Sequence, residues 1–210
     1  VAGIIEPSAG VIEHEGVAVR GINQRIGYMT QTDSVLPWRT VRENVELPLA
    51  LRQMPAAQRR ARVDAMLQAV DLAGFAGSFP NELSGGMRKR VALAQVLVYE
   101  PGTLLMDEPF GALDAQLKLV MQKRLLEVWQ ATGKTVVFVT HDLAEAVTVA
   151  QRVVVFSGRP GSIKAITPID IPGPRDPFKV RFDARFQQAY EQLWAILAPE
   201  IAKGEELSLI

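Results

Sequence analysis

The sequence predicts an α/β fold in which helices cover a mostly parallel sheet and a helical subdomain is inserted. Short apolar segments of strand length alternate with segments of helical periodicity along most of the chain. From about residue 38 to residue 98 only helical patterns occur, which indicates the insertion. The chain has 210 residues, 48% of them hydrophobic, so we expect a single domain over residues 1–210.

The first half of the chain contains two strand patterns followed by helices. Residues 11–19 and 25–30 are expected to be strands. Thr40 with Glu43 three residues later predicts a capping box at a helix start. The next helix, residues 56–70, is amphipathic. Its arginine-rich side is interpreted as a solvated helix face, with an anion site as the less favoured alternative.

The second half alternates between helices and strands. Residues 102–106 and 135–139 are continuous apolar runs, which predict buried strands. Further strands are expected at 152–156 and 163–169, and helices at 84–98, 115–131, from 142 onward and at 180–197, the last within a helical tail over 178–210. The side chains expected to face inward from the helix at 115–131 are Leu117, Val120, Met121, Leu125 and Val128.

Composition excludes several classes of protein. The 23 Lys and Arg residues balance 23 Asp and Glu residues, so charge gives no reason to expect nucleic acid as a partner. The absence of cysteine excludes disulfides and thiolate metal sites. No apolar run approaches the roughly 20 residues of a membrane helix, so we expect another chain to span any membrane involved.

Two acidic residues follow the first buried strand. Asp107 and Glu108 are expected at the carboxyl end of that strand, where open α/β sheets bind ligands. Asp107 could hold Mg²⁺, and Glu108 could orient or deprotonate the water that attacks a γ-phosphate. The alternative is a strand that ends in ordinary solvated carboxylates.

A glycine-rich turn precedes the helix at residues 84–98. Ser84 is a good N-cap, and Gly85 and Gly86 leave backbone N–H groups accessible at the helix N-terminus, an arrangement that attracts phosphate. A glycine-rich helix start without a ligand is the alternative. The basic run Arg88, Lys89 and Arg90 is expected to form the exposed face of this helix.

Two further polar residues follow strands. His141 comes after the strand at residues 135–139 and could donate to a phosphate oxygen. Gln31 comes after the strand at residues 25–30 and could reach a metal or a water through its amide oxygen. Each can also be interpreted simply as a surface residue. They support a functional site only because of their positions after the strands.

Taken together, these residues resemble the nucleotide-binding domain of ABC transporters. The family's motifs occur in order: Gln31 as the Q-loop, Leu83-Ser84-Gly85-Gly86 as the signature, Leu104 to Glu108 as Walker B, Gly111-Ala112-Leu113-Asp114 as the D-loop and His141 as the switch histidine. The resemblance covers nearly the whole chain and implies a P-loop NTPase-like sheet whose helical subdomain, about residues 38–98, carries the signature.

The resemblance also implies roles for these residues in ATP hydrolysis. Glu108 would be the general base and His141 would contact the γ-phosphate, while Asp107 and Gln31 would serve Mg²⁺. Ser84, Gly85 and Gly86 would close on ATP held by a second ATPase subunit in a head-to-tail dimer, and Asp114 is also expected at the nucleotide.

The family's phosphate loop, G-x-x-x-x-G-K-[ST], is not found upstream of Gln31, nor are its N-terminal strands. Gly133-Lys134-Thr135 is not that loop, because Val128 stands where the motif needs glycine and a strand follows. We expect the chain to be an N-terminally incomplete ABC ATPase domain, because of truncation rather than a natural loss, and to be inactive alone.

Other residues resemble importer subunits for nitrate, sulfonate, taurine and related small solutes. The cues are Gln31 to Val45, Met106 to Asp114 and Ser157 to Gly161. The resemblance implies permease subunits that dock near Gln31 to Val45, a solute-binding protein acting indirectly, and a peripheral location on the cytoplasmic face of the membrane. Two alternatives are a non-catalytic partner subunit and an ABC ATPase outside transport. The sequence names neither the solute nor whether the dimer partner is identical.

Overall fold

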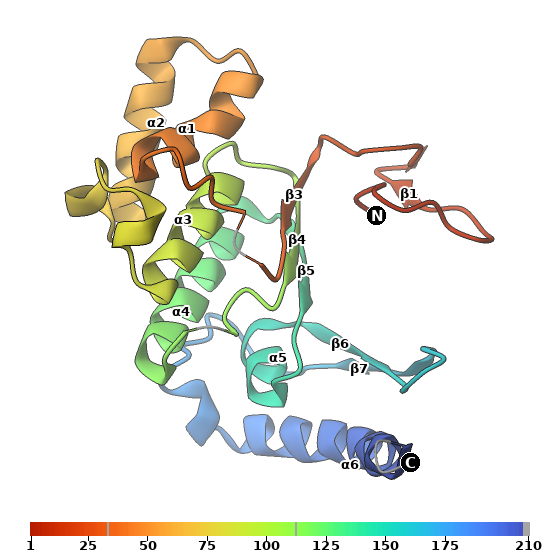
Figure 1. Cartoon of the computed structure of the whole chain (residues 1–210). Coiled ribbons are helices and arrows are strands. Elements are labelled where there is room, and N and C mark those ends of the chain that lie inside the picture. Colours follow the sequence, from red (N-terminus) through yellow and green to blue (C-terminus); the bar gives the residue numbers. More distant parts are fainter. Residues whose placement is uncertain (33, 112, 208–210) are drawn as a thin grey trace. The chain divides into compact units, whose positions relative to one another are not determined.

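The computed structural model describes residues 1–32, 34–111 and 113–207, with side chains as far as residue 202. The chain separates into two compact units. Unit 1 contains residues 1–114 and 133–139, and unit 2 contains residues 115–132 and 140–210. Figure 1 shows both units, with the α-helices and most of the strands labelled. The prediction of one domain over residues 1–210 stays a prediction.

The N-terminal part of unit 1 contains a small hairpin. β1 (Glu13–His14) pairs antiparallel with β2 (Val17–Ala18). The prediction of one strand over residues 11–19 is therefore wrong. The reason is local: Glu15 and Gly16 both have positive φ, 51° and 74°, which makes the two-residue turn that a hairpin requires.

The helices of unit 1 pack around their own apolar core. They are α1 (Val41–Leu51), α2 (Ala56–Ala69), η1 (Ala73–Phe75), η2 (Pro80–Glu82) and α3 (Gly85–Leu97). The predicted capping box is confirmed at the start of α1, because the Thr40 amide donates to Glu43 Oε2 and the Glu43 amide donates to Thr40 Oγ1. Buried residues of this core are Val41, Val45, Leu49, Val63, Leu67, Leu72, Val91 and Ala94.

The arginine-rich side of α2 is joined to its surroundings by ion pairs. Arg59 Nε lies 2.7 Å from Glu46 Oε1, and Arg59 also donates to the Met54 carbonyl. Arg62 lies 3.7 Å from Glu100 in a more exposed pair. Paired charges of this kind favour the interpretation of a solvated helix face over that of an anion site.

A three-stranded parallel sheet completes unit 1 (Figure 1). Its order is β3 (Ile26–Met29), β4 (Thr103–Asp107) and β5 (Thr135–Val139). Gly27 lets β3 approach its neighbours closely, since a Cβ there would lie 2.6 Å from Pro101 Cγ. As predicted, β4 is largely buried, but the prediction for β5 is wrong: Val139 is 53% exposed. β5 stands at the edge of this sheet and alternate side chains face solvent.

Unit 2 consists of helices and one antiparallel strand pair. Its elements are α4 (Ala115–Thr132), α5 (Leu143–Val149), β6 (Arg152–Phe156), β7 (Ile163–Pro168), η3 (Val180–Phe182) and α6 (Ala184–Leu207). Its core combines one face of α6 with α5 and β6, through Phe186, Leu193, Val147 and Val155.

Two predictions within unit 2 need correction. The side chain of Val120 does not face inward; it is exposed on α4, whereas Met121 and Leu125 are buried. The last helix extends to Leu207 rather than residue 197, and starts after a 3-10 turn. The part of the predicted tail at residues 208–210 lies outside the described residues.

Candidate ATPase site and its surroundings

The carboxyl edge of the parallel sheet brings two of the expected site residues together. Met29 of β3 is paired with Met106 of β4, so the residues that follow run on side by side. Gln31 Nε2 donates to Glu108 Oε2 at 3.2 Å. The contact joins residues 77 positions apart, and the parallel register creates it. Gln31 is thus placed against the expected base, a contact that the sequence did not predict.

Glu108 adopts a backbone conformation that non-glycine residues rarely use. Its φ is 45°, in the left-handed region. Its amide donates to the Val139 carbonyl at 2.9 Å, which prolongs the pairing of β4 with β5 by one residue. Its carbonyl accepts from the Gly111 amide at 3.2 Å. These bonds hold a conformation that costs about 1–3 kcal/mol, and such strain is concentrated at functional sites.

The oxygen atoms at this edge fit a hydrated magnesium ion bound together with phosphate. Asp107 ends β4 and offers a carboxylate, and Gln31 offers an amide oxygen. Mg²⁺ prefers hard oxygen ligands and commonly takes one or two carboxylates, with waters and substrate phosphates completing its shell. Among the residues that the structure describes, no group of three or more His, Cys, Asp or Glu side chains is arranged to hold a metal ion.

The glycine-rich turn has the geometry that the sequence predicts. Ser84 is the N-cap of α3, and its Oγ accepts from the Met87 amide at 3.3 Å. Gly85 and Gly86 form the first turn, where backbone N–H groups have no intrahelical acceptor. Both glycines are partly exposed, so these donors remain accessible to an anion from outside.

The basic residues after this turn are not simply an exposed face, and that prediction is wrong. Lys89 is only 4% exposed, and its Nζ donates to the Gln31 carbonyl. Arg90 donates to the carbonyls of Val70 and Asp71, and Arg88 donates to the Leu83 carbonyl at 2.8 Å. Lys89 thereby connects α3 to the segment that carries Gln31. A basic run on a helix gives no sign of this, because the contact spans 58 positions.

Between β4 and α4 the chain is anchored by a buried aromatic side chain. Phe110 is fully buried and packs against Phe138 of β5, with ring centroids 5.5 Å apart. The Leu113 amide donates to the Phe110 carbonyl at 3.1 Å. Asp114, expected at the nucleotide, is exposed at the end of this connection, and Ala112 lies outside the described residues.

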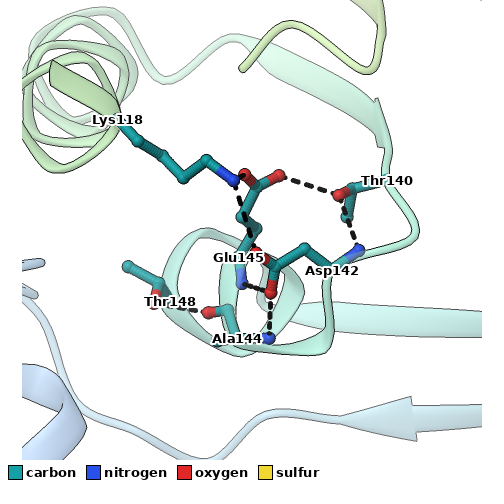
Figure 2. Close-up of polar contacts among 6 residues, drawn as sticks. All are labelled: Lys118, Thr140, Asp142, Ala144, Glu145 and Thr148. Atoms are coloured by element: carbon teal, nitrogen blue, oxygen red, sulfur yellow. Dashed lines mark hydrogen bonds and ion pairs between the residues drawn. The ribbon is translucent and has the colours of Figure 1, made fainter. Parts of the chain in front are cut away.

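His141 belongs to unit 2, where it is exposed immediately before α5. Asp142 is the N-cap of α5 and accepts from the amides of Ala144 and Glu145 at 2.8 and 3.2 Å. Figure 2 shows these bonds together with Thr140 and Lys118, whose side chains both contact Glu145. The sequence predicted His141 as a site residue, but it did not predict the polar contacts formed by its neighbours.

The segment between Gln31 and α1 is held by the side-chain amide of Asn44, a buried residue. The Asn44 side chain donates to the carbonyls of Leu36, Arg39 and Thr40, and accepts from the Leu36 amide at 2.8 Å. Trp38, within the segment so fixed, is 70% exposed. Part of the expected docking segment, Asp33, lies outside the described residues. A large aromatic side chain exposed on a firmly held surface segment is typical of a partner site.

Comparison with known proteins gives the same family for the sequence and for the structure. The family described as ABC transporter matches residues 1–111. An uncharacterised ABC transporter ATP-binding protein of Methanocaldococcus jannaschii is 41% identical, over 97% of this chain and 75% of its own length. The nitrate import ATP-binding protein of Synechocystis is 39% identical, over 94% of this chain and 76% of its own length.

Two further matches extend this result. The taurine import ATP-binding protein of Pseudomonas entomophila is 47% identical over 78% of this chain and 63% of its own length. Among solved structures, the dimeric ATP-binding cassette MJ0796 bound to ADP and Pi has a TM-score of 0.73 and 29% identity, covering 81% of this chain and 78% of that chain. The family match, the relatives and this structural similarity all agree with the order of the motifs in the sequence. We conclude that this chain belongs to the ABC transporter family of ATP-binding proteins.

Proposed function

We propose that the chain is the ATP-hydrolysing subunit of an ABC importer for a small solute of the nitrate, sulfonate or taurine class. The contact between Gln31 and Glu108 is the observation that carries the hydrolysis proposal. It places a carboxylate with a strained backbone beside an amide donor, at the carboxyl edge of a parallel sheet. The similarity to nitrate and taurine import proteins supports the solute class.

In the proposed mechanism Glu108 accepts the proton of the water that attacks the γ-phosphate. Gln31 holds the carboxylate through its amide N–H, which orients the Glu108 side chain toward its role as proton acceptor. His141 donates to a γ-phosphate oxygen. Asp107, with Gln31, would hold Mg²⁺, which when bound neutralises phosphate charge. The N–H groups of Gly85 and Gly86 bind the phosphates of ATP held by the second subunit of a head-to-tail dimer.

Coupling to transport is assigned to the segment between Gln31 and Val45. Trp38 is exposed there, and Asn44 fixes the backbone on either side of it. A permease subunit that docks on this segment would be linked directly to Gln31 and thus to Glu108. No helix among the described residues is long and apolar enough to cross a membrane. The similarity to import ATP-binding proteins supports the proposal that the subunit reaches the cytoplasmic face of the membrane by binding its permease.

Substitution of Glu108 by Gln tests the hydrolysis proposal. In the full-length subunit assembled with its permease, we expect ATP hydrolysis to fall at least about 100-fold, because a general base contributes on the order of 10²–10⁴ in rate. ATP affinity should change less than about twofold, since the side chain keeps its size and can still hydrogen-bond. Steady-state turnover and equilibrium nucleotide binding measure the two effects.

Glu191→Gln, an exposed glutamate on α6, is the matched control and should leave both quantities unchanged. Undiminished turnover of the Glu108 variant would remove this residue from the base role. If the natural subunit hydrolyses no ATP but raises the turnover of a second cassette, it is a non-catalytic partner and the proposal is wrong.

A further inference from the structure

A cluster of four polar side chains lies around the backbone of His141. It consists of Lys118, Thr140, Asp142 and Glu145, here termed the Lys118 cluster, and all four belong to unit 2 (Figure 2). Lys118 Nζ lies 2.8 Å from Glu145 Oε1 and 3.4 Å from Asp142 Oδ2. Thr140 Oγ1 donates to Glu145 Oε2 at 2.7 Å. Both oxygens of Glu145 are therefore engaged.

The cluster fixes the chain on both sides of His141. Thr140 immediately precedes the histidine, and its Oγ1 accepts from the Asp142 amide at 3.0 Å. Asp142 immediately follows, and its Oδ1 caps the amides of Ala144 and Glu145. Residues 140 and 142 are thus tied to each other and to the first turn of α5. The backbone of residue 141 has little freedom left between them.

Lys118 is the only member of the cluster that comes from another element. It stands on the first turn of α4, four residues after Asp114. Its ammonium group crosses from α4 to the carboxylates at the start of α5 (Figure 2). The start of the helix that follows the D-loop is therefore connected to the loop that carries the switch histidine.

Electrostatics makes this connection strong. Glu145 is 2% exposed, and a buried carboxylate is costly unless a cation and hydrogen-bond donors surround it. Burial alone would lower the pKa of Lys118, but the hydrogen bond and charge of Glu145, followed by those of Asp142, outweigh burial and raise that pKa. Lys118 therefore stays protonated at neutral pH, as the buried carboxylate requires.

We propose that Lys118 is a positioning residue for ATP hydrolysis. Through Glu145, Thr140 and Asp142 it holds the His141 loop against the start of α4, and so determines where the imidazole is presented to the γ-phosphate. This proposal rests on the proposed function for the role of His141. It assigns to α4 a part in catalysis that no motif of the sequence indicates.

The first test observes His141 directly and needs no activity. The chain has two histidines, so in His14→Gln all imidazole NMR signals come from His141. In this background Lys118→Met should shift and broaden the imidazole resonances and accelerate amide exchange at residues 142–145 at least about tenfold. Lys118→Arg should largely restore both. Lys123→Met, which changes an exposed lysine on the same helix, should alter neither.

The second test measures turnover in the full-length subunit assembled with its permease. Lys118→Met should lower kcat about tenfold, because a small displacement of a catalytic group is costly, and leave KM for ATP within about twofold. Lys118→Arg should retain most of the rate. If Lys118→Met does not fold, the double variant Lys118→Met/Glu145→Gln removes both charges and keeps an acceptor for Thr140, and the same result is expected.

A folded Lys118→Met protein with unchanged imidazole signals and unchanged kcat would overturn the proposal. A change confined to thermal stability, with His141 undisturbed, would also overturn it, since that outcome means a structural role only. If the natural subunit fails to hydrolyse ATP, the proposed function is wrong. The imidazole signals then still decide whether Lys118 positions His141.

Discussion

At the residue scale, Glu108 combines a proposed catalytic role with a strained backbone. Its positive φ is unfavourable for a glutamate, and glycine would relieve the strain. The side chain is nevertheless needed for the contact with Gln31. The hydrogen bond from its amide to the Val139 carbonyl and the burial of Phe110 two residues later hold the turn in place. The folded sheet thus supplies the stability that this single residue lacks.

Trp38 allows a residue-scale prediction about partners. Because its side chain is largely exposed, Trp38→Ala should change the free energy of unfolding by less than about 0.5 kcal/mol. If the permease docks there, loss of the indole should weaken association by at least about 2 kcal/mol, or roughly 30-fold. Thermal unfolding and co-purification with the permease measure the two effects.

Phe182→Ala is the matched control for Trp38, because Phe182 is 87% exposed in unit 2. It should leave permease binding unchanged. Equal loss of binding in both variants would show that general surface apolarity, rather than the segment after Gln31, supports the association.

At the scale of elements, Arg175 joins parts of unit 2 that the sequence leaves unconnected. Its guanidinium donates to carbonyls of three segments: the end of α5, the residue after β7 and the turn beyond it. The acceptors are the carbonyls of Val147, Thr148, Ala150, Ile169 and Ile171. Burial lowers the pKa of Arg175, but an arginine remains charged, so it can satisfy the carbonyls at a helix C-terminus.

We expect Arg175→Lys to destabilise unit 2 by about 2 kcal/mol, although charge is conserved, because an ammonium has three donors and cannot reproduce the planar fork. Urea unfolding followed through hydrogen exchange of the α5 amides measures the change. Arg181→Lys, at an exposed arginine in η3, should have no effect of this size. If the two variants are equally stable, the carbonyl bonds of Arg175 contribute little.

At the scale of the whole molecule, the proposed nucleotide site is shared between two subunits. The 210 residues contain no G-x-x-x-x-G-K-[ST] sequence. The proposed contacts of Glu108 and of the signature turn belong to different ATP molecules. In the proposed mechanism each ATP therefore contacts two subunits.

The isolated 210-residue chain should accordingly gain little stability from ATP. A ligand at about 100 times its Kd stabilises a protein by about 2.7 kcal/mol, which moves Tm by several degrees. We expect a shift of less than about 1 °C at about 1 mM ATP and Mg²⁺, measured by calorimetry, with AMP as the control ligand. Saturable binding at micromolar ATP would contradict this expectation.

The sequence by itself determined the features that depend on local order. Apolar periodicity predicted the bounds of β3, β4 and the helices α2 to α4 to within a residue or two. The spacing of apolar residues in each segment reflects which of its side chains are buried, and this spacing differs between helices and strands. The capping box at Thr40 and the N-cap at Ser84 are also local and were confirmed. Motif order and spacing indicated the family, because both can be read from the sequence without knowing the fold.

Tertiary structure alone decided which distant residues meet. The contact of Gln31 with Glu108 follows from the register between β3 and β4, and the burial of Lys89 and of Glu145 follows from the packing of one element on another. The hairpin at residues 13–18 depended on two positive φ values that strand-like alternation conceals. Such contacts depend on register and packing between segments far apart in the chain, and residue type at one position does not encode them.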